Sequence, residues 1–231
     1  MMYQTLMQGL PELGLSLEEA TGRQLCAFGE AVVKQNEVMN LTAITDPQQV
    51  AKLHLLDSLS LLKAADLRNK TLIDVGCGAG FPGVPVKIGC PEVKLTLLDS
   101  LGKRVAWLER ILPELGVEAE CITARAEEFA SQRREQYDFA TSRAVARLNI
   151  LLELTAPFVK VGGAVLAMKG AAAKEELEQA QSAISKLGLK LEQLVEFPMD
   201  GTAHAVIVLR KVKPTPAQYP RAFAKIKKSP L

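Results

Sequence analysis

Between residues 71 and 169, short runs of β-branched and apolar residues alternate with segments of helical character, and this alternation restricts the possible folds most strongly. The candidate strands are Thr71–Val75, Lys94–Leu98, Ala119–Thr123, Tyr137–Thr141 and Gly163–Lys169. The helical stretches between them are Phe81–Ile88, Gly102–Leu115 and Leu148–Pro157. Strands that alternate with helices in this way are typical of an α/β fold, in which crossover helices connect parallel strands.

The segment before the first strand is predicted to be helical. Ser16-x-x-Glu19 has the pattern of a capping box and predicts a helix that ends near Asn36. Asp46 followed by Pro47 predicts a second helix, with an N-cap and a proline in its first turn.

After the last of these strands, a long polar helix is predicted from about Ala172 to Leu187. Two further strands follow, Lys190–Phe197 and His204–Arg210, and Asp200-Gly201 between them is a turn signal. We therefore expect a largely parallel sheet of seven strands that ends in an antiparallel hairpin.

The composition excludes several classes of protein. With 231 residues, 48% apolar and 23% charged, the chain is expected to form one large domain, or one domain with an appendage, without overall disorder. No run approaches the roughly 18 apolar residues of a membrane-spanning helix, and no basic residue precedes Arg23, so the charged start of a signal peptide is missing. The four cysteines form no C-x-x-C pair and there are two histidines. We therefore expect no metal site and a cytoplasmic protein with reduced thiols.

The net charge of +2 conceals an asymmetry. Residues 210–231 carry seven basic side chains and no acidic one, whereas the other residues carry 21 basic and 26 acidic groups. Residues 213–231 are therefore predicted to form a basic tail that contacts nucleic-acid phosphates. A tail that only increases solubility is the alternative, and charge alone does not decide between the two.

The segment from Asp74 to Gly83, with the sequence DVGCGAGFPG, follows the first predicted strand and opens a helix. Glycines at this spacing let the backbone turn tightly and approach a ligand closely. The pattern satisfies the dinucleotide fingerprint, but a carboxylate at Asp74 is unfavourable beside a pyrophosphate and suits a cationic amino-acid ligand. A purely structural glycine turn is the alternative.

Asp99 is predicted to end the second strand, 25 positions after Asp74. A carboxylate at that place accepts hydrogen bonds from the ribose hydroxyls of a nucleoside, although Asp99 is also suited to cap the following helix. Asp74, the glycines and Asp99 together indicate a pocket for a nucleoside with an amino-acid tail, and S-adenosylmethionine fits that description.

Several segments resemble one family of enzymes. They are Leu72–Gly83, Leu97–Ser100, Ala126–Phe129 and Thr141–Ala144, with further matches at Asn40–Ile44, His54–Leu59 and Lys103-Arg104. With them, the sequence resembles the bacterial small-subunit ribosomal RNA guanine-N7 methyltransferases, also called glucose-inhibited division protein B, from about Asn36 to Gly170. A weaker likeness recurs in Tyr219–Arg221 and Lys228–Leu231, but Ala222-Phe223-Ala224 departs from the Gly- and Pro-containing basic stretch that members usually have.

The resemblance implies a class I S-adenosylmethionine-dependent methyltransferase, with a Rossmann-like, largely parallel seven-stranded sheet that closes with an antiparallel hairpin. The chain would then consist of an N-terminal helical extension packed on the core (1–69), a methyltransferase core (70–212) and the basic tail (213–231).

Site residues follow from the same resemblance and from the residues themselves. The candidate cofactor-binding residues are Asp74, Gly76, Gly78, Gly80, Phe81, Asp99, Ser100, Leu101, Ala126, Glu127 and Arg143. In the family, Gly76 and Phe81 would contact the cofactor, Asp99 its ribose and Ala126-Glu127 its adenine. The candidate RNA-binding residues are Lys103, Arg104, Arg221, Lys225, Lys227 and Lys228. A solvated helix face is the alternative for the first two.

Arg143 at the end of the fourth strand is the candidate catalytic residue, because it would position the cofactor or the base. A surface ion pair is the alternative. His54 and Asp57 share a helical face and could line the entrance of the nucleotide, but a helix-face hydrogen bond or a partly buried histidine is the commoner explanation.

The expected chemistry needs few catalytic groups. Guanine N7 carries a free lone pair and loses no proton on methylation, so in-line transfer from a sulfonium requires alignment and no general base. Thr141–Arg143 stands where amino-group methyltransferases usually carry an Asn/Asp-Pro-Pro-aromatic run. Cys90 precedes the second strand and Cys77 is expected to be a packing residue, so neither is expected to act as a nucleophile.

The resemblance therefore implies methylation of the N7 of a specific guanine in the 530 loop of 16S ribosomal RNA, within the small ribosomal subunit or a precursor, without a membrane or a metal. Two other hypotheses remain open at this point. One is a non-catalytic assembly factor that binds the cofactor and RNA, and the other is a nicotinamide-dependent oxidoreductase.

Overall fold

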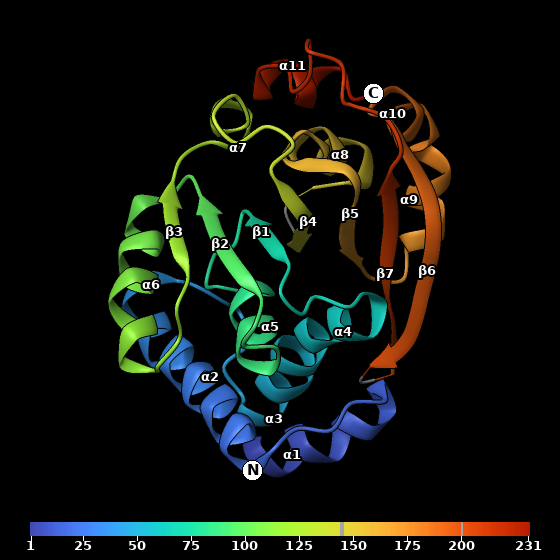
Figure 1. The fold of residues 1–231 in the computed structure, drawn as a ribbon. Coiled ribbons are helices and arrows are strands. Elements are labelled where there is room, and N and C mark those ends of the chain that lie inside the picture. Colours follow the sequence, from blue (N-terminus) through green and yellow to red (C-terminus); the bar gives the residue numbers. More distant parts are fainter. Residues whose placement is uncertain (144–145, 200) are drawn as a thin grey trace.

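The structure is a computed structural model that describes residues 1–143, 146–199 and 201–231. At its centre is one sheet with the strand order β3-β2-β1-β4-β5-β7-β6 (Figure 1). The strands are β1 (Thr71–Val75), β2 (Lys94–Asp99), β3 (Glu120–Thr123), β4 (Tyr137–Arg143), β5 (Val159–Lys169), β6 (Leu189–Met199) and β7 (Thr202–Lys211). Ala144 of the family-like segment and Asp200 of the predicted turn lie outside the described residues.

The strand pairing confirms the predicted topology. β1 is parallel to β2 and β4, β2 is parallel to β3, and β4 is parallel to β5. β7 is antiparallel to both β5 and β6, as expected for the closing hairpin. The chain runs outward from β1 to β3 and then crosses to β4 on the other side of β1. Open α/β sheets bind ligands at the carboxyl ends of the strands beside such a switch point.

Both faces of the sheet are covered by helices. Neighbouring residues of a strand face opposite sides, so Leu72 and Leu97 join one hydrophobic core while Ile73 and Leu98 join the other. The helices of the first core are α1 (Met2–Gly9), α2 (Glu19–Met39), α4 (Asp57–Ala64), α5 (Gly83–Gly89) and α6 (Gly102–Glu114). Those of the second are α7 (Ala126–Phe129), α8 (Leu148–Thr155), α9 (Ala173–Gln179) and α10 (Gln181–Lys186). Burial on both faces explains why these strands are continuous apolar runs in the sequence.

The predicted helix start at Asp46 is confirmed. The Asp46 carboxylate accepts hydrogen bonds from the backbone N–H groups of Gln48 and Gln49, at 3.0 and 2.9 Å, and α3 (Pro47–Val50) follows. A π-helical turn (Ala51–Leu56) then connects α3 to α4.

Two local predictions were wrong. α2 begins at Glu19 without a side-chain cap, because the Glu19 carboxylate is bonded to Arg23 one turn later instead of to the helix start. The polar helix predicted over 172–187 is interrupted at buried Ala180, whose backbone (φ −92°, ψ 4°) leaves the helical conformation, so α9 and α10 are separate helices.

The C-terminal residues do not extend away from the molecule. The backbone N–H groups of Val212 and Lys213 donate to the Gly188 carbonyl at 2.8 and 3.1 Å, so the chain remains bonded to the core directly after β7 ends. The last helix, α11 (Phe223–Lys228), lies at the top of Figure 1.

Candidate functional site

A cavity of about 590 Å³ lies at the carboxyl ends of β1, β2 and β4, within the size range of small-molecule sites. Most of the predicted cofactor residues line it, namely Gly76, Gly78, Phe81, Asp99, Ser100, Leu101, Ala126, Glu127 and Arg143. The fold therefore brings together segments that are up to 67 residues apart in the sequence. Asp74 and Gly80 are the two predicted residues that are absent from the described lining.

The glycine loop turns over the end of β2. The backbone N–H groups of Gly76 and Cys77 donate to the Leu98 carbonyl at 2.7 and 3.1 Å. Gly76 and Gly78 have φ values of +74° and +56°, which glycine adopts without strain. A Cβ on Gly78 would meet nothing nearer than Nη1 of Arg104, at 3.8 Å. The loop therefore presents bare backbone to the cavity.

Asp74 and Gly80 support this loop from beneath. The Asp74 side chain is fully buried, and its Oδ2 accepts a hydrogen bond from the Gly83 N–H at 2.8 Å. Burial raises the pKa of Asp74 to about 7. A Cβ on Gly80 would come within 2.8 Å of Val84, so this glycine permits close packing on α5. Asp74 was expected to contact a cationic ligand directly. In this geometry its carboxylate is buried and binds the backbone at the start of α5 instead.

Asp99 faces the cavity from the end of β2. Its Oδ2 accepts a hydrogen bond from the Gly78 N–H at 2.9 Å, and its Oδ1 accepts one from the Leu101 N–H at 2.8 Å. Each carboxylate oxygen keeps capacity for a further donor. Two neighbouring hydroxyl groups of a ligand would complete the coordination of this side chain.

Arg143 is held from several sides at the end of β4. Its Nη1 donates to the Leu53 carbonyl at 2.9 Å and to Oδ2 of Asp57 at 3.0 Å. Its guanidinium carbon lies 5.1 Å from the centroid of the Phe81 ring. The ion pair that was the alternative for Arg143 exists, but it is not on the surface, because the side chains of Arg143 and Asp57 are 17% and 8% exposed.

His54 lines the cavity as a buried ring stacked on Phe81, with 4.7 Å between the ring centroids. Its Nδ1 lies 3.2 Å from Nη2 of Arg143. Nδ1 also lies 3.0 Å from the Leu53 carbonyl oxygen, and Nε2 lies 2.7 Å from Thr42 Oγ1. Burial, followed by the charge on Arg143, lowers the pKa of His54 to about 4, so the ring is neutral at neutral pH.

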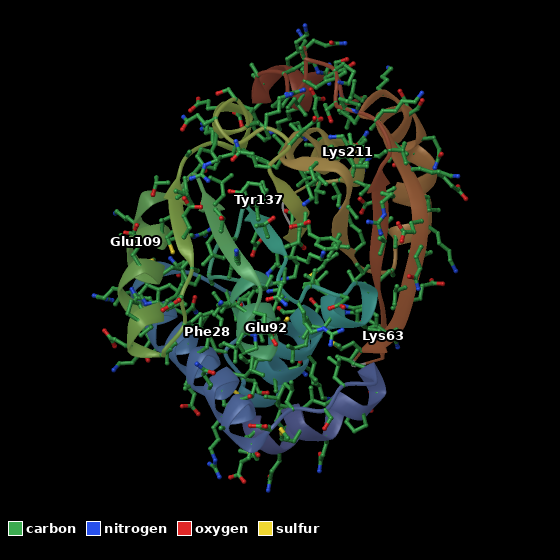
Figure 2. All side chains as sticks on the ribbon, in the orientation of Figure 1. Phe28, Lys63, Glu92, Glu109, Tyr137 and Lys211 are labelled. Atoms are coloured by element: carbon green, nitrogen blue, oxygen red, sulfur yellow. The ribbon has the colours of Figure 1, made fainter. Side chains whose placement is uncertain are left out.

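The ring stack continues into the N-terminal helices. The Phe81 ring also packs against Phe28 of α2, with 5.2 Å between the ring centroids, and Figure 2 labels Phe28 on that helix. The N-terminal helices therefore support one wall of the cavity.

A second cavity of about 350 Å³ lies on the other side of Arg143, which lines both. Asp57, Arg147, Lys169 and His204 also line it. The His204 Nδ1 lies 2.8 Å from the Asp57 Oδ1, and this hydrogen bond raises the pKa of His204.

The predicted RNA-binding residues fall into different environments. Four are exposed, namely Lys103, Lys225, Lys227 and Lys228. Arg104 is half-buried and lines the cofactor cavity. Arg221 is bound to the fully buried Glu153 through its backbone N–H, Nε and Nη2. Arg221 is therefore committed to a contact within the protein.

Sequence reasoning missed several lining residues. Leu41 and Thr42 line the cavity, and both backbone N–H groups are held by the Asn36 side chain, at 2.6 and 2.8 Å. They belong to the family-like segment Asn40–Ile44, so a signal for them was present. Leu154 and Phe223 also line the cavity, but nothing in their local sequence marks them.

Within residues 1–143, 146–199 and 201–231, no group of three His, Cys, Asp or Glu side chains is placed to hold a metal ion. The helices of the same ranges include none with the length and apolar character needed to cross a membrane.

Comparisons with known proteins show the family of this chain. The family model described as "GidB: rRNA small subunit methyltransferase G" matches residues 21–204. "Ribosomal RNA small subunit methyltransferase G" of Alkaliphilus metalliredigens is 44% identical and covers 98% of this chain and 97% of its own. The protein of the same name in Leuconostoc citreum is 41% identical over the full length of both chains.

Solved structures share the fold at low sequence identity. A putative methyltransferase from Bacillus halodurans has a TM-score of 0.54 at 14% identity, over 68% of this chain and 99% of its own. M. jannaschii TYW2, solved in complex with AdoMet, has a TM-score of 0.53 at 15% identity, over 63% of this chain and 70% of its own. Because the family match covers the glycine loop, Asp99 and Arg143 together, the chain belongs to the rRNA small subunit methyltransferase G family.

Proposed function

We propose that this protein transfers the methyl group of S-adenosylmethionine to the N7 of a guanine in the 530 loop of 16S ribosomal RNA. Family membership supports the methyltransferase activity and the small-subunit rRNA substrate. The resemblance described above supports the guanine, its N7 atom and the 530 loop. The observation that carries the proposal is that the matched region, 21–204, contains the residues that meet in the larger cavity around Asp99.

The chemistry of this cavity fits the cofactor, whose bound form supplies an electrophilic sulfonium methyl group. Asp99 would accept hydrogen bonds from the ribose hydroxyls, and the bare backbone at Gly76 and Gly78 would admit the amino-acid end. Ala126 and Glu127 would border the adenine. Because Asp74 lies beneath the loop, it does not repel a pyrophosphate, so the preference over a nicotinamide dinucleotide rests on family membership.

The end of β4 suits a reaction without proton removal. The Thr141 hydroxyl donates to the Leu166 carbonyl at 2.9 Å, and the Ser142 hydroxyl donates to the Val75 carbonyl at 2.7 Å. Arg143 carries only donors. These described side chains therefore leave no free base at the strand end, and guanine N7 needs none, because its lone pair attacks the methyl carbon in line.

We assign the base to the second cavity. Arg143 separates the two cavities and contacts both, so it would orient the guanine with N7 toward the cofactor. Arg147 at the mouth of this cavity is exposed and suited to a phosphate. Arg143 would thus act by alignment, which accounts for large rate effects in reactions of this kind.

The proposal makes the small ribosomal subunit, or a precursor of it, the partner and the cytoplasm the place of action. Residues 70–212 would form the catalytic core. Residues 1–69 would support the cavity wall, and the exposed lysines of residues 213–231 would contact RNA phosphates.

Transfer of tritium from labelled S-adenosylmethionine to small subunits of a strain lacking this protein tests the proposal. Borohydride–aniline treatment then cleaves RNA at N7-methylguanine. We expect one cut in the 530 loop with the wild type, a large loss with Asp99→Ala, and wild-type labelling with the matched control Asp66→Ala, whose carboxylate pairs with Arg68 at the surface. Labelling without an aniline cut would overturn the N7 assignment, and cofactor binding without labelling would favour the non-catalytic assembly factor.

A further inference from the structure

The C-terminal tail is built into the core. The Thr215 N–H donates to the Glu135 carboxylate at 2.8 Å, and the Thr215 hydroxyl donates to the Leu187 carbonyl at 3.0 Å. Arg134 donates to backbone carbonyls of the tail, including those of Thr215 and Tyr219. Arg134 and Glu135 thus hold the tail from the core on both sides of Thr215.

Two further contacts fix the orientation of α11. Arg221, two residues before the helix begins, donates its backbone N–H, Nε and Nη2 to Glu153 of α8, at 2.9, 2.7 and 2.6 Å. Glu153 is fully buried, so losing this partner would leave a buried charge uncompensated. Ile226 within the helix is also fully buried. The helix is therefore fixed at its start and in its middle.

Phe223 lies between these two contacts and lines the larger cavity. Among the described residues after β7, it is the one that reaches this cavity. The cavity wall also includes Leu154 of α8, next to Glu153, and Ala126 with Glu127 at the start of α7. Arg221 and Ile226 therefore set the position of Phe223 relative to the wall assigned to the adenine.

We propose that Phe223 is a cofactor-contacting residue that covers the adenine, and that the tail is part of the cofactor site. This inference rests on the proposed function. A flat aromatic side chain suits a purine ring, because every base offers a π face for stacking. Deletion of residues 213–231 should therefore weaken cofactor binding.

Calorimetric titration of purified full-length variants tests the inference without using activity. The probes are S-adenosylhomocysteine and methylthioadenosine, which share the adenosine but differ in the amino-acid end. Phe223→Ala should weaken both by about tenfold, because the lost contact is to the part that they share. Phe223→Tyr should restore affinity. Val212→Ala should match the wild type, because Val212 is an exposed apolar residue directly before the tail and lies outside the cavity lining.

Phe223→Leu separates stacking from loss of tail docking, because leucine keeps apolar volume but offers no flat ring. It should bind both probes more weakly than Phe223→Tyr while unfolding at the wild-type temperature. Wild-type affinity of Phe223→Ala would overturn the inference, as would weakened binding of S-adenosylhomocysteine alone. Failure of the proposed function is distinct from either result, since it would appear as a wild-type protein that binds neither probe or transfers no methyl group.

Discussion

Arg143 and Asp57 form a buried ion pair that connects the end of β4 to the N-terminal helix α4, with 3.0 Å between Nη1 and Oδ2. The other Asp57 oxygen is bonded to His204 of β7. Three segments of the chain therefore meet in one charged cluster, and this cluster lies between the two cavities. The wall that would align the methyl donor with the base thus depends on residues outside the glycine loop.

Replacing Arg143 by alanine should abolish most methyl transfer. Misplacement of the reacting groups by about 1 Å costs on the order of 100-fold in rate, so we expect at least about this loss of turnover. The free energy of unfolding should fall by about 2 kcal/mol, because Asp57 loses one of its two partners while remaining buried. Single-turnover labelling and urea denaturation measure the two effects.

The matched control is Arg23→Ala, which removes an arginine from the ion pair with Glu19 on the surface of α2. Exposed pairs contribute little to stability, so this variant should retain both turnover and stability. Wild-type turnover of Arg143→Ala would remove this residue from the catalytic alignment.

The stability of the protein should depend on His54 at acidic pH. Because the pKa of His54 is lowered to about 4 in the fold, the unfolded chain binds its proton near pH 6.5 and the folded one does not. The His54 side chain therefore binds more protons in the unfolded state between these values, and its contribution to stability falls as the pH is lowered through this window. Denaturation of both proteins from pH 7 to 4 should show that the wild type loses about 3 kcal/mol relative to His54→Gln, which lacks this titrating group.

His204 provides a control of opposite sign. Its hydrogen bond to Asp57 raises its pKa, so its contribution is present at low pH and is lost as the pH rises through the raised value. The difference between wild type and His204→Gln should therefore shrink toward alkaline pH. A loss of this difference on acidification would contradict the assigned hydrogen bond.

Asp74 should change the stability of the protein in the same pH range as His54, but with the opposite sign. Its pKa is raised to about 7 by burial, so the folded protein holds a proton that the unfolded chain releases near pH 4. The contribution of Asp74 to stability should fall as the pH rises from 4 to 7, by about 2–4 kcal/mol. Asp74→Asn should lose this slope in chemical denaturation. An unchanged slope would show that the carboxyl group is ionised beneath the loop.

The central strands could be predicted from the sequence because they are buried on both faces. Leu72 and Ile73 belong to different cores, so the apolar run is continuous and its length identifies a strand. The glycine loop and Asp99 were predictable for a local reason. The sequence shows glycines, which adopt a positive φ without strain, and it shows a carboxylate at the end of a predicted strand.

The direction of Asp74 was harder to predict. Alternation along β1 places Asp74 on the same face as Leu72, beneath the start of α5, but a motif reading directs it toward the ligand. Phe223 is a clearer case, because its position depends on the Arg221–Glu153 pair, which joins residues 68 apart. Contacts at such separations leave no periodic signal in the sequence.

The basic residues of the tail should separate into a structural group and an RNA-binding group. Lys225, Lys227 and Lys228 are exposed on α11, and each phosphate contact contributes roughly 0.7–0.9 to the slope of log affinity against log salt concentration. Replacing all three by alanine should reduce this slope by about 2 in filter-binding titrations with small-subunit RNA, without lowering the unfolding temperature.

Arg221→Ala should have the opposite effects, with an unchanged salt slope and a loss of about 3 kcal/mol in stability, because Glu153 remains buried without its partner. Point variants are required, since deletion of the tail removes the lysines, Arg221 and Phe223 together. Equal slopes for the wild type and the triple variant would move the phosphate contacts away from α11.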